Sequence, residues 1–442
     1  FEHQKTTAAF LTLNRRAFCL NEMGTGKTCS VIWAFDYLMT LGIIKRALII
    51  CPLSIMDAAW HKDLFITAMH RTIDIAHGDK HKRKKIIRGD SEVVVINFDG
   101  VEIVEEDIAR SDFDLIVVDE ATYLKNVSTN RWKAVNRLVR PTTWLWLLTG
   151  TPAAQSPMDA YGLIKLVSPS KVPRAVNAFR DIVQVRVAQY KFVNRPNVEG
   201  MLYSMMQPAI RFTKEECLDL PELTYQTRNI PLSSQQEKYY KTFKKELLIQ
   251  AAGEEITAAN AAVMINKLLQ LSSGSIYADS GDIIEFDITP RATELINIIK
   301  ETSHKTIVFV MFKHTIALVD KLLTQEGYST AVIHGGVNEK KRADIFNKFQ
   351  TTDSPQVLII QPQAASHGVT LHAANTIVWW GVPMSLETYK QGNARIHRAG
   401  QVNKCSVVHL IGSPAEHKVL ETLENKNMSQ TKLLDLYKDV LL

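Results

Sequence analysis

Arg16-Ala-Phe-Cys-Leu-Asn-Glu-Met-Gly-Thr-Gly-Lys27-Thr28 is the stretch of this chain that decides its fold class. Residues 16–20 are predicted to form an apolar strand, and a helix is predicted from Lys27 to Leu41. The glycines between these elements allow the backbone to curl, so that its N–H groups face an anion at the positive end of the helix dipole. The order of strand, glycine-rich turn and helix predicts an α/β unit with a phosphate-binding loop.

Short apolar runs rich in β-branched residues alternate with helical patterns in both halves of the chain. Further strands are predicted at residues 47–51, 93–96, 115–118 and 143–148, and then at 306–312, 330–333, 357–360, 376–379 and 406–411. Near-continuous apolar strands separated by helices predict parallel sheets that are covered on both faces. The predicted fold class is therefore α/β, with two doubly wound parallel-sheet lobes that carry helical insertions.

The alternating pattern breaks within each half, and these breaks suggest the domain boundaries. The first lobe is expected over residues 1–217, with a helical insertion at 153–215. The second lobe is expected over residues 218–442, with a helical insertion at 233–290 and C-terminal helices at 414–442. Residues 218–223 are expected to form an extended connector, because Pro221 biases the residue before it away from the helical region.

The composition favours an intracellular protein that contains neither a zinc cluster nor a disulfide framework. The chain has 442 residues, of which 46% are apolar, and a formal net charge of +6, which permits a polyanionic partner. Its five cysteines are scattered singly, which fits a reducing cytosol. The longest apolar runs have strand length, so no membrane span is expected, and no signal-peptide pattern opens the chain. A monomer is expected in the cytoplasm, or in the nucleus of a eukaryote.

Two groups of residues in the first half have the chemistry of a nucleotide site. In the glycine-rich turn, Lys27 is predicted to reach the β- and γ-phosphates of ATP, and the Thr28 hydroxyl is predicted to bind Mg²⁺. Asn21 stands where the strict phosphate-loop motif has its first glycine, so only the second half of that motif matches, and an ordinary glycine turn is the alternative. Asp119 and Glu120 follow an apolar strand, at an edge where open α/β folds bind ligands.

These two acids suggest different roles. Asp119 is predicted to hold Mg²⁺ through its hydration shell, and Glu120 is predicted to position or deprotonate the attacking water. The alternative is a solvated strand end. Near the C-terminus, Arg395 and Arg398 lie three residues apart, so on a helix they would share one face and could point at the same anion. The alternative for this pair is a solvated helix face.

With these residues in view, the chain resembles the Swi/Snf-type translocases of helicase superfamily two over nearly its whole length. The matching segments are Gln4, Met23 to Thr28 (Met23, Gly24, Thr25, Gly26, Lys27 and Thr28), Cys51-Pro52-Leu53-Ser54, Asp119 to Lys125-Asn126, Leu148-Thr-Gly-Thr-Pro152, Ala365-Ser366-His367-Gly368 to Leu371, and Gln391 to Gln401. Two positions depart from the family pattern. Thr122 replaces the usual His, and Ala394 replaces a usual Asp.

The resemblance implies two RecA-like lobes, with ATP and Mg²⁺ bound at a cleft between them. It implies that Arg395 and Arg398 reach the γ-phosphate across this cleft and that Gln4 reads adenine. The residues that it implies for nucleotide binding also include Met23, Gly24, Thr25, Gly26, Gly368 and Gln391. The residues that it implies for DNA contact are Pro52, Ser54, Lys125, Asn126, His334, Gly335 and Ser366.

The function that the resemblance favours is an ATP-dependent DNA translocase on duplex, forked or branched DNA, with a role in fork remodelling during replication, recombination or repair. The alternatives are a strand-separating DNA or RNA helicase and a nucleotide-gated DNA-binding regulator. A Rossmann dehydrogenase is excluded, because no Gly-x-Gly-x-x-Gly opens the first helix. The basic run from Lys80 to Arg88 is either a phosphate-contacting patch or a solvated helix face.

Overall fold

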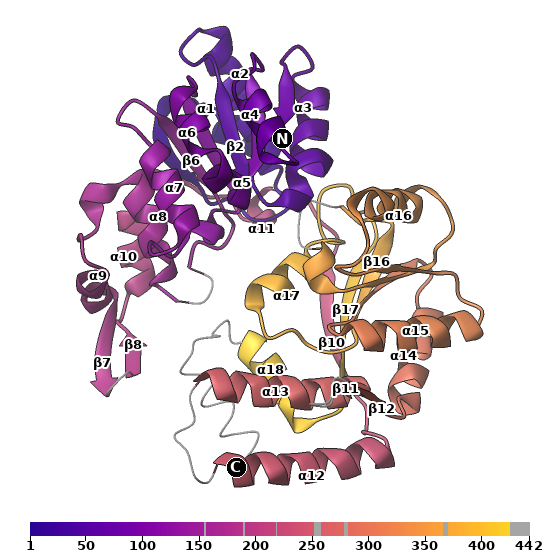
Figure 1. Cartoon of the computed structure of the whole chain (residues 1–442). Coiled ribbons are helices and arrows are strands. Elements are labelled where there is room, and N and C mark those ends of the chain that lie inside the picture. Colours follow the sequence, from indigo (N-terminus) through magenta and orange to yellow (C-terminus); the bar gives the residue numbers. More distant parts are fainter. Residues whose placement is uncertain are drawn as a thin grey trace. The chain divides into compact units, whose positions relative to one another are not determined.

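The computed structural model of the chain describes residues 1–153, 156–188, 191–217, 219–251, 258–277, 282–365 and 370–424. These residues form two compact units, Phe1–Asp219 and Leu220–Leu442 (Figure 1). Each unit has its own parallel sheet and its own hydrophobic core, and each is described here by itself. In the part of the chain that the structure describes, no helix is long and apolar enough to cross a membrane.

The first unit is built on a seven-stranded sheet in the order β3-β4-β2-β5-β6-β1-β9, and every pairing in it is parallel. The strands are β1 (Arg16–Cys19), β2 (Ala47–Cys51), β3 (Ile73–Ile75), β4 (Val93–Asn97), β5 (Leu115–Asp119), β6 (Trp144–Leu148) and β9 (Ala209–Ile210). Successive residues of the central strands are buried on opposite faces of the sheet, as Ile116 and Val117 are, in two separate core clusters. This two-sided burial is why the strands consist of continuous apolar runs, and it confirms the predicted parallel sheet.

Helices cover both faces of this sheet (Figure 1). They are α1 (Glu2–Leu13), α2 (Lys27–Thr40), the 3₁₀ turn η1 (Leu53–Ile55), the π-helix η2 (Met56–His61), α3 (Lys62–Thr67), α4 (Lys80–Ile87), α5 (Phe98–Ile103), α6 (Glu105–Arg110), the 3₁₀ turn η3 (Ala121–Leu124) and α7 (Asn130–Leu138). The helix predicted from Lys27 is present and ends at Thr40.

The region after β6 contains more than the helices expected there. Its elements are α8 (Asp159–Val167), η4 (Pro169–Lys171), α9 (Val176–Val183), β7 (Gln184–Ala188), β8 (Lys191–Asn194), α10 (Val198–Met205) and α11 (Lys214–Cys217). The antiparallel hairpin of β7 and β8 was not predicted. Strand β9 was also missed, because a two-residue strand has no periodicity and is defined only by its pairing with β1.

The second unit is built on a six-stranded parallel sheet in the order β10-β17-β16-β13-β15-β14. Its strands are β10 (Leu223–Asn229), β13 (Lys305–Phe309), β14 (Thr330–Ile333), β15 (Val357–Ile360), β16 (Ala374–Trp379) and β17 (Cys405–Ile411). The sequence predicted the last five of these strands and missed β10. It pairs with β17 over seven residues at the edge of the sheet, and its polar, largely exposed side chains hide it from a search for apolar runs.

The helices of the second unit are α12 (Ser234–Ala251), α13 (Ala258–Ser273), α14 (Thr289–Glu301), α15 (Lys313–Gln325), α16 (Glu339–Thr351), η5 (Pro362–Ala365), α17 (Leu386–Asn393) and α18 (Pro414–Glu424). A small hairpin of β11 (Ser275–Tyr277) and β12 (Ile283–Glu285) follows α13. The C-terminal helices were predicted over 414–442, and α18 is the part of that range which the structure describes, since residues 425–442 lie outside it.

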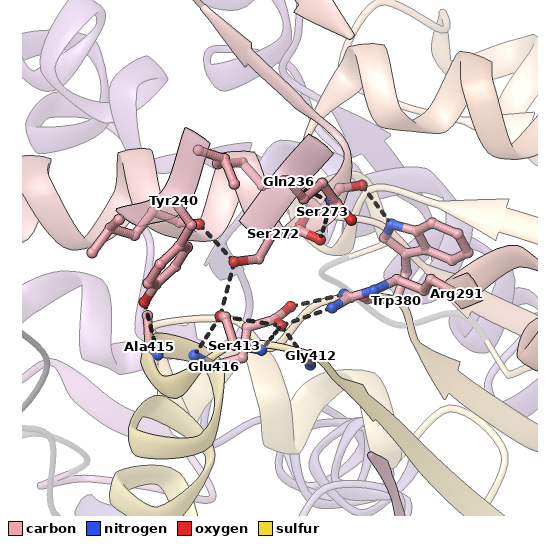
Figure 2. A network of polar contacts seen from close by, with 12 residues as sticks. Gln236, Tyr240, Ser272, Ser273, Arg291, Trp380, Gly412, Ser413, Ala415 and Glu416 are labelled. Carbon is pink, nitrogen blue, oxygen red and sulfur yellow. Dashed lines mark hydrogen bonds and ion pairs between the residues drawn. The ribbon is translucent and has the colours of Figure 1, made fainter. Parts of the chain in front are cut away.

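A buried ion pair holds α18 to the rest of the second unit (Figure 2). The two guanidinium nitrogens of Arg291 donate to the two carboxylate oxygens of Glu416, each at 2.7 Å, and the side chains are only 5% and 1% exposed. Arg291 also donates to the Trp380 carbonyl. The Glu416 carboxylate accepts further bonds from the backbone of Gly412 at 2.9 Å and of Ser413 at 3.1 Å. Both charges are therefore fully compensated, as burial of an ion pair requires.

Polar contacts extend this pair into the helical insertion (Figure 2). The Ser272 hydroxyl and the Ser413 hydroxyl are 2.8 Å apart, and the Gln236 amide donates to the Ser272 carbonyl at 3.2 Å. The backbone N–H of Ala415 donates to the Tyr240 hydroxyl at 3.3 Å. Helices α12 and α13 are thus connected to α18 by bonds that lie inside the unit rather than on its surface.

Candidate functional site

Three loops of the first unit meet at the carboxyl edge of its sheet. Strands β5, β6 and β1 are neighbours and parallel, so the segments that follow them leave the same edge. The Thr149 N–H, just after β6, donates to the Cys19 carbonyl at the end of β1 at 3.1 Å. A Cβ at Gly150 would lie 3.5 Å from the Asn21 carbonyl oxygen, so the loop after β6 lies against the glycine-rich turn.

The glycine-rich turn has the curled backbone that the sequence predicted. Gly24 and Gly26 have φ angles of 86° and 79°, in the left-handed region that a side chain at either position would disfavour. Gly26 is the N-cap of α2, and Lys27 is the first residue of that helix. The Lys27 ammonium donates to the carbonyls of Asn21 at 2.9 Å and Glu22 at 3.1 Å, so the lysine folds back across the turn.

Helix α1 supports the turn from one side. The His3 imidazole, which is 6% exposed, makes a 2.8 Å hydrogen bond to the Thr25 carbonyl. The Gln4 amide donates to the same carbonyl at 3.3 Å, and a Cβ at Gly26 would come within 1.9 Å of the Gln4 amide nitrogen. The sequence singled out Gln4 but missed His3. A buried histidine in a helix gives no local signal, because its partner lies 22 residues away along the chain.

Asn21, which departs from the strict motif, has a contact role of its own. Its side-chain amide donates to the Thr7 hydroxyl at 2.8 Å, and its side-chain oxygen accepts from the Phe212 N–H at 3.0 Å. These bonds connect the turn to α1 and to the segment that follows β9. A glycine at this position could make neither bond. Asn21 therefore restricts the turn through two side-chain hydrogen bonds where the strict motif has a flexible glycine.

Asp119 ends β5 at the same edge, as the sequence predicted. Its carboxylate accepts from the Trp60 indole N–H and from the Glu120 backbone N–H, both at 3.0 Å. Burial raises the pKa of Asp119, and the positive charge of Lys27 opposes this shift. Trp60 lies in η2 and is fully buried. Its bond to Asp119 joins the helical segment after β2 to this site.

Glu120 lies next to Asp119 in a rare backbone conformation. Its φ and ψ angles are 54° and 55°, in the left-handed region that a non-glycine residue adopts at a cost. The chain turns there from β5 directly into η3. Backbone outliers of this kind cluster at functional sites, which makes Glu120 a stronger candidate than its sequence position alone.

The site fits the phosphates of a nucleotide on two observations. No side chain among the described residues caps the N-terminus of α2, so the first N–H groups of this 14-residue helix are open to an anion. The buried Thr151 hydroxyl, in the loop after β6, has no hydrogen-bond partner within the described ranges. Thr28 lies in the first turn of α2, half-buried, and Met23 and Thr25 lie within the turn itself.

In the second unit, the structure corrects the prediction for the two arginines. Helix α17 ends at Asn393, so Arg395 and Arg398 do not share a helix face but lie on the turns that follow. The physical reason is that this segment bonds to other parts of the chain instead of continuing the helix. The Leu371 N–H donates to the Arg395 carbonyl at 3.0 Å, and the His397 ring bonds to the Pro221 carbonyl at 2.9 Å.

Gln401 closes this turn segment. Its side-chain amide donates to the Ala374 carbonyl at 2.9 Å and to the Ile396 carbonyl at 3.2 Å. Gly400, just before it, has a φ angle of 96°, which favours glycine. Gly400 and Gln401, which end the matching segment Gln391 to Gln401, therefore have a structural role, since Gln401 holds the turns that carry Arg395 and Arg398 against the start of β16.

Close packing sets the position of α17 itself. A Cβ at Gly392 would lie 2.8 Å from the Trp379 ring, and the Trp379 indole N–H donates to the Asn393 side chain at 2.8 Å. Gln391 is buried and its amide donates to the Glu387 carboxylate at 3.2 Å. Ala394, the C-cap of α17, lies directly before Arg395, whose side chain is also buried.

The candidate DNA-contacting residues of the first unit lie in the segments that follow β2 and η3. Pro52 and Ser54 follow β2 at the carboxyl edge of the sheet, in and before η1. Lys125 forms a 3.5 Å ion pair with Asp159, and the Asn126 side chain accepts from the Ser128 N–H at 3.0 Å. Thr122, which replaces the family histidine, is buried within η3.

The candidates of the second unit are partly described. The His334 ring accepts from the Gly336 N–H at 3.0 Å, and the Gly335 N–H donates to the Gln361 side chain at 3.2 Å, so this segment forms a structural turn. Ser366 and Gly368 lie outside the described residues.

The basic run from Lys80 to Arg88 forms α4 and its C-cap, and part of it is structural. The buried Arg83 guanidinium donates to the Ala76 carbonyl at 2.7 Å and to the Asn97 side chain at 2.9 Å. Lys84 and Arg88 form ion pairs with Asp107 at 3.5 Å and 2.5 Å. These three cations hold the helix in place, so the run is neither a single patch nor a fully solvated face.

Comparisons with known proteins agree with this arrangement. A model of the SNF2-related domain matches residues 3–275, and a model of the helicase conserved C-terminal domain matches residues 290–400. The chain is 25% identical over 421 residues to an uncharacterized ATP-dependent helicase of Mycoplasma genitalium, covering 94% of this chain and 40% of that protein. It is 24% identical over 442 residues to the chromodomain-helicase-DNA-binding protein 1-like of Danio rerio, covering 94% of this chain and 41% of that protein.

This chain thus spans about 40% of the length of these two relatives. Among solved structures it is similar to the Sulfolobus solfataricus SWI2/SNF2 ATPase core in complex with dsDNA, at 21% identity and a TM-score of 0.47, covering 96% of this chain and 89% of that one. The first family model alone covers more than half of the chain. The chain belongs to the SNF2-related helicase family.

Proposed function

We propose that the chain is an ATP-driven motor that moves on DNA. The observation that carries this proposal is the meeting of three loops at one edge of the first sheet, with Lys27 and the pair Asp119 and Glu120 among their residues. A glycine-rich turn, a cation and two acids at a sheet edge are the parts that phosphoryl transfer from a nucleotide requires. Family membership supports the same chemistry, since a relative is named an ATP-dependent helicase.

ATP is proposed to bind through its phosphates at the start of α2. The backbone N–H groups from Gly24 to Thr28 would surround the phosphates, at the positive end of the helix. Lys27 would exchange its bonds to the Asn21 and Glu22 carbonyls for bonds to the β- and γ-phosphates. Gln4, which already lies against Gly26, is proposed to contact the adenine.

Hydrolysis is proposed to depend on the two acids in different ways. Mg²⁺, held by the Thr28 hydroxyl and through water by Asp119, would neutralise charge on the phosphates. Glu120 would orient the attacking water and accept its proton, since the residue lies next to Asp119 in a fixed and unusual conformation. Burial makes the charged form of Asp119 less stable, which raises its pKa. A bound cation would stabilise that charged form.

The second unit is proposed to supply the positive charge that the transferring phosphoryl group needs. Arg395 and Arg398 are the candidates, with Gln391 and Gly368 as further nucleotide contacts. Such arginines contribute on the order of 10³ to 10⁵ in rate in related phosphoryl-transfer enzymes. Gln401 and the packing of Gly392 hold the turns that carry these arginines against β16.

DNA is proposed as the track, with contacts from Pro52, Ser54, Lys125 and Asn126 in the first unit. In the second unit, the turn at His334 and Gly335 and the segment at Ser366 are the proposed contacts. The finer proposal is movement along duplex, forked or branched DNA without wholesale strand separation, in fork remodelling. A strand-separating helicase and a nucleotide-gated regulator remain the alternative functions.

The experiment measures ATP hydrolysis with no nucleic acid and with single-stranded, duplex, forked and RNA cofactors. Duplex or forked DNA is expected to stimulate turnover most. Glu120→Gln is expected to keep ATP affinity within a few-fold, while turnover falls by roughly 10² or more. Stimulation by RNA alone would favour the strand-separating alternative, and unchanged turnover in Glu120→Gln would remove Glu120 from the mechanism.

A further inference from the structure

The hairpin of β7 and β8 is a projecting ribbon that neither unit's sheet absorbs. It leaves the C-terminus of α9 and extends away from the sheet of the first unit (Figure 1). Among the residues that the structure describes, its two strands pair with each other and with no further strand, in a two-stranded antiparallel sheet. An isolated two-stranded hairpin is marginally stable in water, so its presence on the surface calls for either anchoring or a partner.

The base of the ribbon is anchored. Phe179 and Val183 of α9 are fully buried, and the Phe179 ring packs on Tyr161 at a centroid distance of 5.1 Å. The Arg195 N–H closes the ribbon by donating to the Val183 carbonyl at 3.0 Å. The side chains of Gln184 and Asn194, which face each other across the pair, are joined at 3.0 Å. These contacts fix the direction in which the base of the ribbon leaves the first unit.

The two faces of the ribbon differ in chemistry. Val185 and Val193 oppose each other on one face and are 42% and 49% exposed. On the other face, Arg186 opposes Phe192, and the Arg180 guanidinium lies 4.9 Å from the centre of the Phe192 ring. This contact orients a cation of α9 along the ribbon. One face is thus apolar and the other carries positive charge over an aromatic ring.

Charge around the ribbon is strongly unbalanced. Residues 171–205 contain six lysines and arginines but only two acids, Asp181 and Glu199. This segment holds an excess of four positive charges, in a chain whose whole formal charge is +6. A concentrated positive charge on a projecting element complements a polyanion.

We infer that the β7–β8 ribbon is a second contact for duplex DNA, outside the loops of the sheet edges, with its basic face toward the phosphate backbone. A two-stranded ribbon has dimensions that the major groove of a duplex admits, and exposed valines can contact thymine methyl groups there. Phosphate contacts by Arg180 and Arg186 would position the duplex without reading its sequence. This inference rests on the proposed function, because it adds a contact to a motor that already uses DNA.

The test removes the ribbon without opening its base. Gln184 and Asn194 face each other, so a two-residue Asn-Gly turn can replace residues 185–193. This change removes two cations, Arg186 and Lys191. The matched control is Lys82→Ala with Lys85→Ala, which removes two exposed cations from α4. Arg186→Ala, a single exposed change, and Val185→Thr with Val193→Thr separate the effects of charge and apolar surface.

The measurement is the binding of each protein to labelled duplex DNA across a salt series, with ATP hydrolysis recorded with and without DNA. The truncated ribbon is expected to make the slope of log affinity against log salt shallower by about 2, because it removes Arg186 and also the Phe192 ring that orients Arg180. Arg186→Ala is expected to make the slope shallower by about 1. The control is expected to keep the wild-type slope. Hydrolysis without DNA is expected to be unchanged in all variants, because none of these residues belongs to the proposed ATP site.

An unchanged slope in the truncated ribbon, or an equal loss in the α4 control, would overturn the inference. A loss of DNA affinity caused by the valine changes but not by Arg186→Ala would show that the basic face does not contact the phosphates, and would also overturn the inference. Failure of the proposed function looks different: the wild type would bind DNA with a slope that the ribbon controls, yet show no hydrolysis that DNA stimulates. A wild type that binds no DNA would overturn both.

Discussion

Asp119 and Glu416 are both carboxylates in largely buried positions, and their surroundings differ. Glu416 accepts from two nitrogens of Arg291 and from the backbone of Gly412 and Ser413, so its charge is neutralised and its oxygens are filled. Asp119 accepts from the Trp60 indole and the Glu120 N–H. Burial raises the pKa of Asp119. Lys27, whose charge opposes this shift, bonds to carbonyls of the glycine-rich turn.

The difference separates a carboxylate whose bonds stabilise the fold from one that is proposed to bind a ligand. A buried ion pair with all its bonds made is costly to break, because either partner alone is an uncompensated charge. A carboxylate whose charge burial disfavours gains from a cation that binds later. We therefore expect a carboxylate-to-amide change at Asp119 to lower activity, and the same change at Glu416 to lower stability.

Asp119→Asn is expected to give the largest effect. Turnover of ATP should fall by roughly 10³, because the metal contact contributes several kcal/mol to the transition state. The raised pKa means that the folded state binds the proton more tightly than the unfolded state, so ionisation above the folded pKa costs stability. The amide avoids this cost, and thermal melting at pH 7 should therefore be unchanged or higher. Retained turnover would contradict the assignment of Asp119.

Glu416→Gln is expected to show the opposite division. Removing one charge leaves Arg291 buried and unpaired, which should cost about 3 kcal/mol of stability. Hydrogen–deuterium exchange is expected to rise in α14 and α18, where the two partners lie, and the melting temperature should fall. Turnover per folded molecule should remain near that of the wild type. If exchange in α14 and α18 is the same in the variant as in the wild type, the ion pair does not hold α18.

His409 offers a third buried titratable group and a pH test. Burial lowers its pKa from 6.5 to about 4, and its ring bonds to the Tyr389 hydroxyl at 2.9 Å, beside the Tyr225 ring. Between pH 4 and 6.5 the unfolded state therefore binds more protons, so stability falls as the pH is lowered through this window and is constant above it.

The expected loss across that window is about 2 kcal/mol, after allowance for incomplete burial. His409→Gln keeps an acceptor for Tyr389 but cannot titrate. Thermal melting of the two proteins from pH 4 to pH 7 should show a smaller acid-induced decrease in the variant. Parallel curves would mean that other groups cause the acid sensitivity.

His3→Ala tests whether α1 supports the glycine-rich turn, and it should have the smallest effect. The imidazole bond to the Thr25 carbonyl is a single buried hydrogen bond, worth about 1 kcal/mol, so ATP affinity should fall about fivefold with little change in turnover. His70→Ala is the matched control, because His70 is exposed and pairs with Asp36. Equal affinity in the wild type and His3→Ala would show that the His3 hydrogen bond does not position the turn.

The sequence predicted much of the first site for a local reason. Glycines before Lys27 and acids after an apolar strand are signals carried by neighbouring residues, and the strand edges they mark meet because parallel strands share a carboxyl edge. It predicted less of the second site. It placed Arg395 and Arg398 on one helix face, because spacing alone cannot show that α17 ends at Asn393.

By itself, the sequence determined the two parallel sheets, the order of the motifs and the identity of the charged residues at the first sheet edge. The tertiary structure alone decided which residues hold them: His3 and Asn21 on the glycine-rich turn, Trp60 on Asp119, and Gln401 on the arginine-bearing turns. Periodicity and glycine positions act over a few residues and can be read locally. Partners that lie far apart along the chain meet only when the crossovers of the sheet bring them together, so no local pattern records them.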